Sequence, residues 1–136
     1  MDRVTAYEGE RYRIVFARLG NGQSPGAEFF DELSAEQKAK LVNLFRLLAD
    51  HGKISNPEKF GVLDKKRRLY EFKSYQIRMP FAYAEPGLVV ITHGFRKKRD
   101  KAPKSEIERA IRIFDEDQRR AKIRTMTPRT GRGGRR

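Results

Sequence analysis

The chain has 136 residues, and its 31 Lys and Arg against 18 Asp and Glu give a formal net charge of +13 at pH 7. This length fits one domain. No apolar run approaches the roughly 18 residues of a membrane helix, and the first residues do not form a signal peptide, so we expect a cytoplasmic protein without a membrane partner. The absence of cysteine excludes disulfides and thiolate catalysis, and two histidines argue against a metal site.

The positive charge favours a polyanionic partner such as nucleic acid, but it is unevenly distributed. Residues 118–136 contain eight cations and no acid, and without them the net charge falls to +5. The segment 123–136 also lacks hydrophobic periodicity. We therefore predict a folded domain over 1–122 and a basic, disordered tail over 123–136. The tail is either a solvated arm or a contact for ribosomal RNA or a protein partner.

The first half of the chain predicts a strand followed by two helices. Residues 10–20 alternate apolar and polar side chains, which is typical of a strand. Ser24, followed by proline, marks the start of a first helix. Ser34 and Gln37 form a capping box for a second helix, and Gly52 ends it. Its apolar face consists of Leu41, Leu44, Phe45 and Leu48.

The second half predicts three strands and a last helix. The strands are RLYEFKSY, QIRMPFAYAE and GLVVITHGF, and their short connections indicate an antiparallel meander. Pro80 interrupts the middle strand, so we expect a bulge or an early end there. After the basic run RKKRDK, a capping box of Ser105 and Glu108 starts a helix whose apolar stripe is Ile107, Ala110, Ile111 and Phe114. The fold class is α+β, with an N-terminal strand, a helical hairpin, a three-stranded antiparallel meander and a C-terminal helix.

None of the common enzyme motifs is present, and the strongest candidates for function are cations. Strand alternation places Lys73 on the face opposite Phe72, and it places Arg78 opposite its two apolar neighbours. Together with Lys97 they would form a concave patch that suits a phosphate backbone. The alternative is that the arginine is a salt-bridge partner and the lysine-rich loop is merely solvated. Asp115 and Asp117 are expected on a solvated helix face.

Two further residues have two possible interpretations each. His93 alternates in phase with the apolar residues of its strand, so it is either a packed histidine or a proton-transfer group that faces the basic loop. Tyr75 lies in a turn, where it is either a sheet residue or a ring on which an RNA base stacks.

The second half of the chain resembles the RelE/HigB superfamily of toxins from toxin–antitoxin systems, and most of all its phage-associated HigB-like branch. The resemblance lies in LYEFK at 69–73, Arg78, HGFRKK at 93–98, and Pro103 with EIERA at 106–110. The order of elements from about residue 10 to 118 also fits. The resemblance implies a small RelE-like domain.

The resemblance further implies a function. Such toxins enter the ribosomal decoding site and cleave mRNA without a metal or other cofactor, and a cognate antitoxin, often with a helix-turn-helix DNA-binding part, neutralises them. The 2′-hydroxyl of a ribose attacks the adjacent phosphate, which requires a base, an acid and charge stabilisation. By this resemblance Arg78 and Lys97 stabilise charge, and Lys73 or Lys98 transfers a proton. The expected contacts to mRNA and ribosomal RNA are Arg96, Arg99, Lys101 and Tyr75. Glu71 stands where some relatives have a second lysine, so its role stays open.

Two alternative functions remain at this point. The chain could be a non-catalytic RNA- or ribosome-binding protein on the same scaffold, or a structural protein of phage origin that lost the site. The cations retained at the matching positions favour the endoribonuclease, although a fold alone does not establish a function. The sequence does not indicate the oligomeric state or the codon preference.

Overall fold

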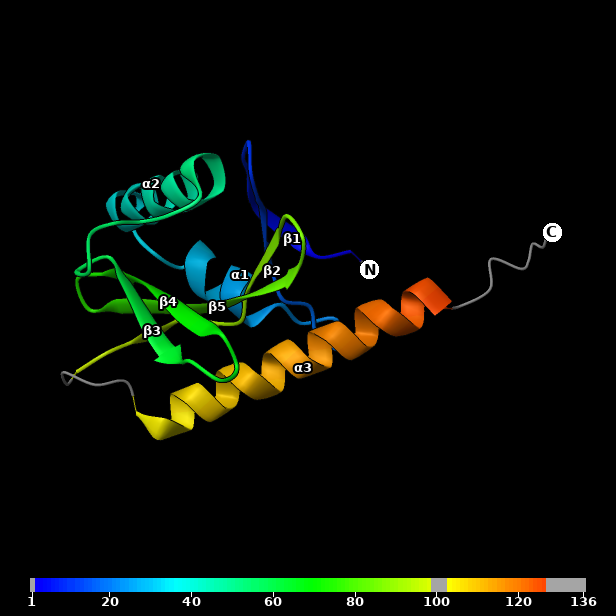
Figure 1. Cartoon of the computed structure of the whole chain (residues 1–136). Helices are drawn as coiled ribbons and strands as arrows, with labels where there is room; N and C mark the ends of the chain where they lie inside the picture. Colours follow the sequence, from blue (N-terminus) through cyan, green and yellow to red (C-terminus); the bar gives the residue numbers. More distant parts are fainter. Residues whose placement is uncertain (1, 99–102, 127–136) are drawn as a thin grey trace.

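The computed structural model describes residues 2–98 and 103–126 and confirms the α+β class (Figure 1). Its strands are β1 (Val4–Glu8), β2 (Arg13–Phe16), β3 (Phe60–Asp64), β4 (Leu69–Ser74), β5 (Ile77–Glu85), β6 (Leu88–Ile91) and β7 (Phe95–Arg96). Its helices are α1 (Pro25–Asp31), α2 (Ala35–His51) and α3 (Lys104–Met126). In these ranges, no helix combines the length and the apolar character that crossing a membrane requires.

The seven strands of the described residues form one mixed sheet in the order β1-β2-β6-β5-β4-β3, and β7 pairs with β5. Strands β3 to β6 make an antiparallel meander, while β2 runs parallel to β6. The sequence predicts one N-terminal strand, whereas the structure has the hairpin β1–β2. Neither β1 nor β3 contains the buried alternation that sequence patterns detect, since both are exposed or only partly buried.

Helices α1 and α2 cover one face of the sheet, and α2 begins and ends as predicted. The hydroxyl of Ser34 accepts the N–H of Gln37, and the Gln37 side chain accepts the N–H of Ser34. Gly52 ends the helix with a left-handed φ of 88°. The predicted apolar face is buried against side chains of the sheet that include Ile14, Phe16, Phe72 and Phe81.

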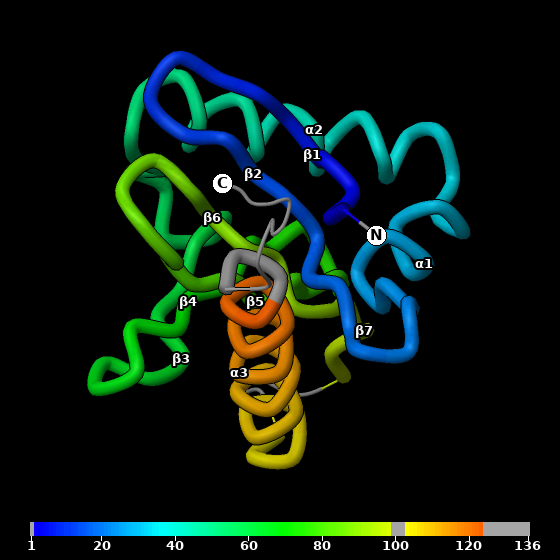
Figure 2. Tube along the Cα trace, turned by 90° about the vertical axis from the view of Figure 1, so that its right-hand side faces the viewer, coloured from blue at the N-terminus to red at the C-terminus, as the bar shows by residue number. Residues whose placement is uncertain are grey.

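Helix α3 covers the opposite face, as Figures 1 and 2 show from two directions. Its Ala110 and Ile113 are buried against Val15, Leu69, Ala82 and Val90. The predicted capping box of Ser105 and Glu108 is wrong, because the chain is already helical at Lys104. The helix continues to Met126, beyond the predicted domain limit at residue 122. Most of the predicted tail, residues 127–136, lies outside the described residues.

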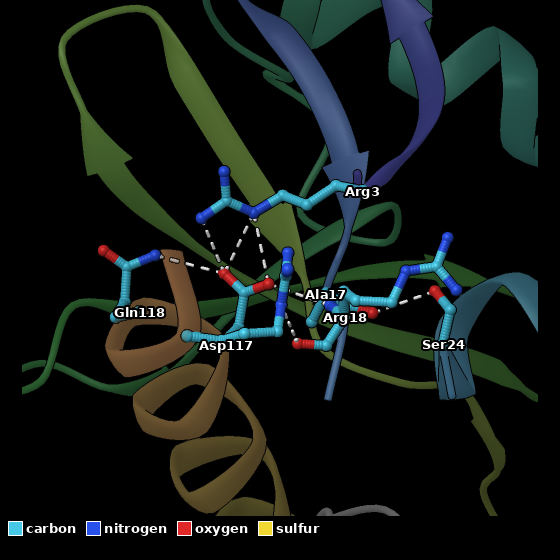
Figure 3. A network of polar contacts seen from close by, with 7 residues as sticks. Arg3, Ala17, Arg18, Ser24, Asp117 and Gln118 are labelled. Carbon is cyan, nitrogen blue, oxygen red and sulfur yellow. Dashed lines mark hydrogen bonds and ion pairs between the residues drawn. The ribbon is translucent and has the colours of Figure 1, made fainter. Parts of the chain in front are cut away.

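Asp117 fastens α3 to the start of the chain, which corrects its predicted place on a solvated face. Its side chain is 0% exposed. Arg3 donates to both carboxylate oxygens at 2.9–3.1 Å, and the main-chain N–H of Arg18 donates at 2.8 Å (Figure 3). Nearby, Ser24 does not cap α1 with its side chain but donates its hydroxyl to the carbonyl of Ala17. These contacts fix the position of α3 over the sheet.

Pro80 lies inside β5 without ending or bulging the strand at that point. It is the register partner of Glu71, and its carbonyl accepts the N–H of Thr92 at 2.9 Å. The two main-chain polar groups of a strand residue point to the same neighbour, so the missing N–H of Pro80 also falls on the side of Thr92. There β6 has ended at Ile91 and β7 has not yet begun. The ladder with β4 therefore loses no hydrogen bond.

Candidate functional site

Lys73 and Arg78 are register partners in the neighbouring strands β4 and β5. Directly opposite residues of an antiparallel pair extend from the same face of the sheet. Phe72 and Met79, next to them in sequence, are buried in the core under α2. Lys73 and Arg78 therefore extend from the other face, on the side of α3, where both are partly exposed. The predicted common face of these two cations is confirmed.

Lys97, the residue directly after β7, joins this group. Phe95 pairs with Arg78 and Arg96 pairs with Ile77, so Arg96 points to the face opposite the one that carries Arg78. The next residue, Lys97, donates its main-chain N–H to the carbonyl of Gln76 at 2.7 Å, and its charge acts on Glu71. Lys73, Arg78 and Lys97 thus gather around one carboxylate, and we name these three residues the cationic cluster. Lys98 is exposed beyond it.

Glu71 lies among these cations and is only 6% exposed. Burial raises the pKa of Glu71, and Arg78, Lys97 and Lys73 oppose this shift without cancelling it. Its register partner on β3 is Gly61. A β-carbon at Gly61 would lie 3.2 Å from Oε2 of Glu71 and 3.5 Å from Nζ of Lys73. The glycine therefore makes room for both charged side chains.

Two buried side-chain atoms in this region, Oε1 of Glu71 and Nε of Arg78, have no hydrogen-bond partner among the described residues. Nη1 of the same arginine instead donates to the carbonyls of Tyr75 and Ile77, at 2.5 and 2.9 Å. Leaving a buried polar group unsatisfied costs about 1–3 kcal/mol. Buried polar atoms without a partner are more common where a site serves a function than elsewhere in a fold.

The residues predicted to contact RNA are divided between several places. Tyr75 is 71% exposed in the turn between β4 and β5. Arg96 and Tyr75 both line a hollow on the α2 side of the sheet, together with Lys40 of α2. Lys40 has no sequence motif around it, so the sequence does not reveal that it belongs here. Arg99 and Lys101 lie outside the described residues.

His93 is 1% exposed and lies in the link between β6 and β7, against the first turn of α3. Its Nδ1 is 3.0 Å from the hydroxyl of Thr92, and its Nε2 is 2.9 Å from Oε1 of Glu106. The ring also stacks on Phe95. Burial lowers the pKa of His93, and the hydrogen bond with Glu106 opposes this effect. The packed arrangement is what the structure shows, and a proton-transfer role stays a prediction.

The cluster presents cationic donors from β4, from β5 and from the residue that follows β7, which can stabilise negative charge on a phosphate. A lysine ammonium among them can also donate a proton. Within residues 2–98 and 103–126, no group of three or more histidine, aspartate or glutamate side chains is arranged to hold a metal ion.

Residues 28–115 match the family model described as "Phage derived protein Gp49-like (DUF891)". The matched segment runs from α1 through the meander into α3, so it contains the whole cationic cluster. No curated protein matches the chain. Because the match covers well over half of the sequence, the chain belongs to the Gp49-like family of phage-derived proteins, which is part of the RelE/ParE-like toxin superfamily.

Proposed function

We propose that this protein is the toxin of a toxin–antitoxin system and that it cleaves mRNA on the ribosome, as in the HigB-like branch of the superfamily. Membership of the Gp49-like family supports a toxin. The observation that carries the nuclease activity is the cationic cluster, in which Lys73 and Arg78 of paired strands and Lys97, directly after β7, gather around Glu71.

The proposed reaction is attack of a ribose 2′-oxygen on the adjacent phosphorus. The new bond joins this oxygen to phosphorus, and the bond to the 5′-oxygen of the next nucleotide breaks. The products are a 2′,3′-cyclic phosphate and a 5′-hydroxyl. A base removes the proton of the 2′-hydroxyl, and an acid gives a proton to the leaving 5′-oxygen. We assign the stabilisation of the phosphate charge to cations of the chain, without a metal.

Within this reaction we assign the charge stabilisation to Arg78 and Lys97, whose cationic ends can contact the phosphate oxygens. We assign the proton transfer to the leaving oxygen to Lys73, the register partner of Arg78. Lys98 is the other candidate for this transfer. It is exposed and one residue further along the chain than Lys97, and a substitution at each position separates the two.

Glu71 is a positioning residue in this proposal. Its Oε1 is buried, so this carboxylate oxygen is not open to a substrate atom. Its carboxylate attracts Arg78, Lys97 and Lys73 and so keeps three mutually repelling charges close to one another. We assign a similar indirect role to His93, which joins the end of the meander to α3 through Glu106.

The proposed partners follow from the family and from the charge. The toxin superfamily supports a cognate antitoxin, for which we propose a helix-turn-helix DNA-binding part. The proposed nucleic-acid partners are mRNA in the decoding site and ribosomal RNA, which places the protein in the cytoplasm. Arg96, Arg99, Lys101 and the basic tail are the proposed additional contacts.

Induced expression in bacteria tests this proposal. Growth should stop, and mapping of mRNA 5′ ends should reveal new ends that require translation. Lys73→Ala, Arg78→Ala and Lys97→Ala should restore growth, whereas Lys65→Ala should not, because Lys65 lies in the turn at the opposite end of β4. Full toxicity of all three cluster variants would refute the site. Cleavage of free RNA without ribosomes would refute ribosome dependence.

A second function, RNA or ribosome binding without cleavage, is favoured by two features of the cationic cluster. The guanidinium of Arg78 is engaged with two main-chain carbonyls, and a carboxylate lies among the three cations. Both features reduce the charge available to a phosphate. Salt-sensitive RNA binding with no new 5′ ends would support this second function.

A further inference from the structure

The surface beside α2 contains three adjoining hollows, of about 300, 360 and 480 Å³. The first two share Glu36, Lys40 and Ser74, and the last two share Asn43, Leu44 and Lys59. Together they form a groove that runs from the turn between β4 and β5 along α2 to the end of that helix. We name it the α2 groove. It lies on the face of the sheet opposite the cationic cluster.

Tyr75 forms one end of the α2 groove in an unfavourable backbone conformation. Ser74 and Ile77 are register partners, so Tyr75 and Gln76 make a two-residue hairpin loop. Tyr75 has a φ of 56°, in the left-handed region where glycine or asparagine is normal and a bulky residue is strained. Its ring is nevertheless 71% exposed, so core packing does not explain its presence. A strained and exposed aromatic residue is typical of a binding site.

Two lysines from different elements lie next to the Tyr75 ring. Nζ of Lys40 is 4.7 Å from the ring centroid and donates to the phenol oxygen at 3.1 Å. Nζ of Lys59 is 5.5 Å from the same centroid. The hydrogen bond from Lys40 lowers the pKa of Tyr75. The ring is therefore held in place by ammonium groups, which can also contact a phosphate.

The charge along the α2 groove is predominantly positive. Lys40, Lys59, Lys53 and Arg96 line it together with His51, and among the described residues its lining contains one carboxylate, that of Glu36. An aromatic ring beside a row of cations is the arrangement by which proteins hold single-stranded nucleic acid, because bases stack on the ring and phosphates follow the cations. A helical peptide would instead need open apolar pockets, whereas Leu44 in this groove is only 4% exposed.

We propose that the α2 groove binds single-stranded RNA next to the nucleotide that is cleaved, with one base stacked on Tyr75 and its phosphates on Lys40 and Lys59. This inference rests on the proposed function and extends it. Arg78 of the cationic cluster donates to the carbonyl of Tyr75, so one strand of RNA that crosses this turn would contact both faces. The groove would then determine which bases are accepted beside the cleavage position.

The test is a titration of the full chain with a short RNA that contains 2-aminopurine and carries 2′-O-methyl groups, so that it is not cleaved. Stacking on Tyr75 should quench the fluorescence. Tyr75→Asn, which suits a left-handed φ but lacks the ring, should weaken binding roughly 5- to 150-fold. Tyr75→Phe should retain the quenching. A plot of the logarithm of the binding constant against the logarithm of the salt concentration has a slope, and Lys40→Gln and Lys59→Gln should each reduce its size by about 0.7. The control Lys65→Gln should leave this slope and the affinity unchanged.

Three results of the binding and neutralisation measurements would overturn the inference. The first is absence of binding by the unaltered protein. The second is equal binding by Tyr75→Asn. The third is a loss of neutralisation by the antitoxin in Lys40→Gln and Lys59→Gln with RNA binding unchanged, which would assign the groove to an acidic protein partner.

Failure of the groove and failure of the enzyme remain distinguishable. Lys73→Ala should abolish ribosome-dependent cleavage and keep the quenching. Quenching that requires Tyr75 in a protein that cleaves nothing would refute the endoribonuclease and retain the groove. If the rate of cleavage is unchanged in Tyr75→Asn, the groove is refuted and the endoribonuclease is retained.

Discussion

Nη1 of Arg78 donates to the main-chain oxygen of Tyr75 at 2.5 Å, and this bond links the two faces of the sheet at one hairpin turn. Arg78 belongs to the cationic cluster on the α3 side, while the ring of Tyr75 belongs to the α2 groove. The turn is therefore the place where a substitution can affect charge stabilisation and base stacking together. The following experiments separate these effects from each other and from stability.

Arg78→Lys should lower the rate of mRNA cleavage by about 100- to 1000-fold, although it preserves the charge. The ammonium lacks the planar fork with which the guanidinium can hold a carbonyl and a phosphate at once. Single-turnover cleavage on programmed ribosomes would measure this loss. The matched control is Arg67→Lys, in an exposed ion pair with Asp115 at the other end of the sheet. Equal losses in both variants would contradict a specific role of the guanidinium at Arg78.

Glu71→Gln should make the protein more stable at pH 7. Burial raises the folded-state pKa of this carboxyl above its ordinary value of 4.5, so the folded state binds more protons than the unfolded state above pH 4.5. Stability is therefore lost as the pH rises from 4.5 through the folded-state pKa. Glutamine does not ionise and avoids this loss.

Urea denaturation at pH 4 and pH 7 would check the Glu71→Gln prediction. The free energy of unfolding of the variant should exceed that of the unaltered protein at pH 7 and approach it at pH 4. Its cleavage activity should fall, because the three cations lose their common counter-charge. A variant that is less stable at pH 7 would show that the carboxylate stabilises the fold.

Tyr75→Asn should raise the free energy of unfolding by about 0.5–1 kcal/mol, because asparagine tolerates the left-handed φ of 56° and tyrosine does not. The same substitution should weaken RNA binding. Thermal unfolding would measure the first effect. Tyr75→Phe keeps the strain and should be no more stable than the unaltered protein. A destabilised Tyr75→Asn would mean that the ring contributes more to the fold than its exposure suggests.

Asp117→Ala should destabilise the protein by about 3 kcal/mol, since it removes a buried carboxylate that accepts hydrogen bonds from Arg3 and Arg18. Asp115→Ala, on the same helix, is the control. Asp115 pairs with Arg67 while both side chains are more than 40% exposed, so its loss should cost less than about 0.5 kcal/mol. Similar losses in chemical denaturation would contradict the anchoring role of Asp117.

His93 should make stability decrease below about pH 6.5. Burial lowers the folded-state pKa of His93, with Arg109 and Arg112 adding to the shift and Glu106 opposing it. As the pH falls, the unfolded chain therefore takes up a proton on His93 before the folded chain does. The contribution of His93 to stability is complete above pH 6.5 and is lost as the pH falls toward the folded-state pKa. In His93→Gln the decrease between pH 7 and pH 5 should be smaller. An identical decrease would assign the effect to other groups.

Local sequence rules predict much of this fold because local chemistry determines the features concerned. The capping box of Ser34 and the glycine that ends α2 are set by neighbouring residues alone. Strand alternation likewise places Lys73 and Arg78 on one face, since the period of two is a property of each strand.

The features that sequence patterns miss depend on residues far apart in the chain. Asp117 stands in a run of charged and polar residues, which suggests a solvated surface, yet it is buried by contacts with Arg3 and Arg18 beside the first strands. Lys40 and Lys59 reach Tyr75 from a helix and from the approach to β3, and no spacing rule connects them. Pro80 likewise fits inside β5 only because the chain opposite it is the gap between β6 and β7, which follow it in sequence.

The bond between Arg3 and Asp117 joins residues that are 114 positions apart. During synthesis the first strands therefore leave the ribosome long before the helix that fastens them. Until α3 is made, Val15 and Val90 on one side of the sheet lack their apolar cover. The chain completes its core late, so an incomplete product of translation would expose an apolar face of the sheet rather than a folded domain.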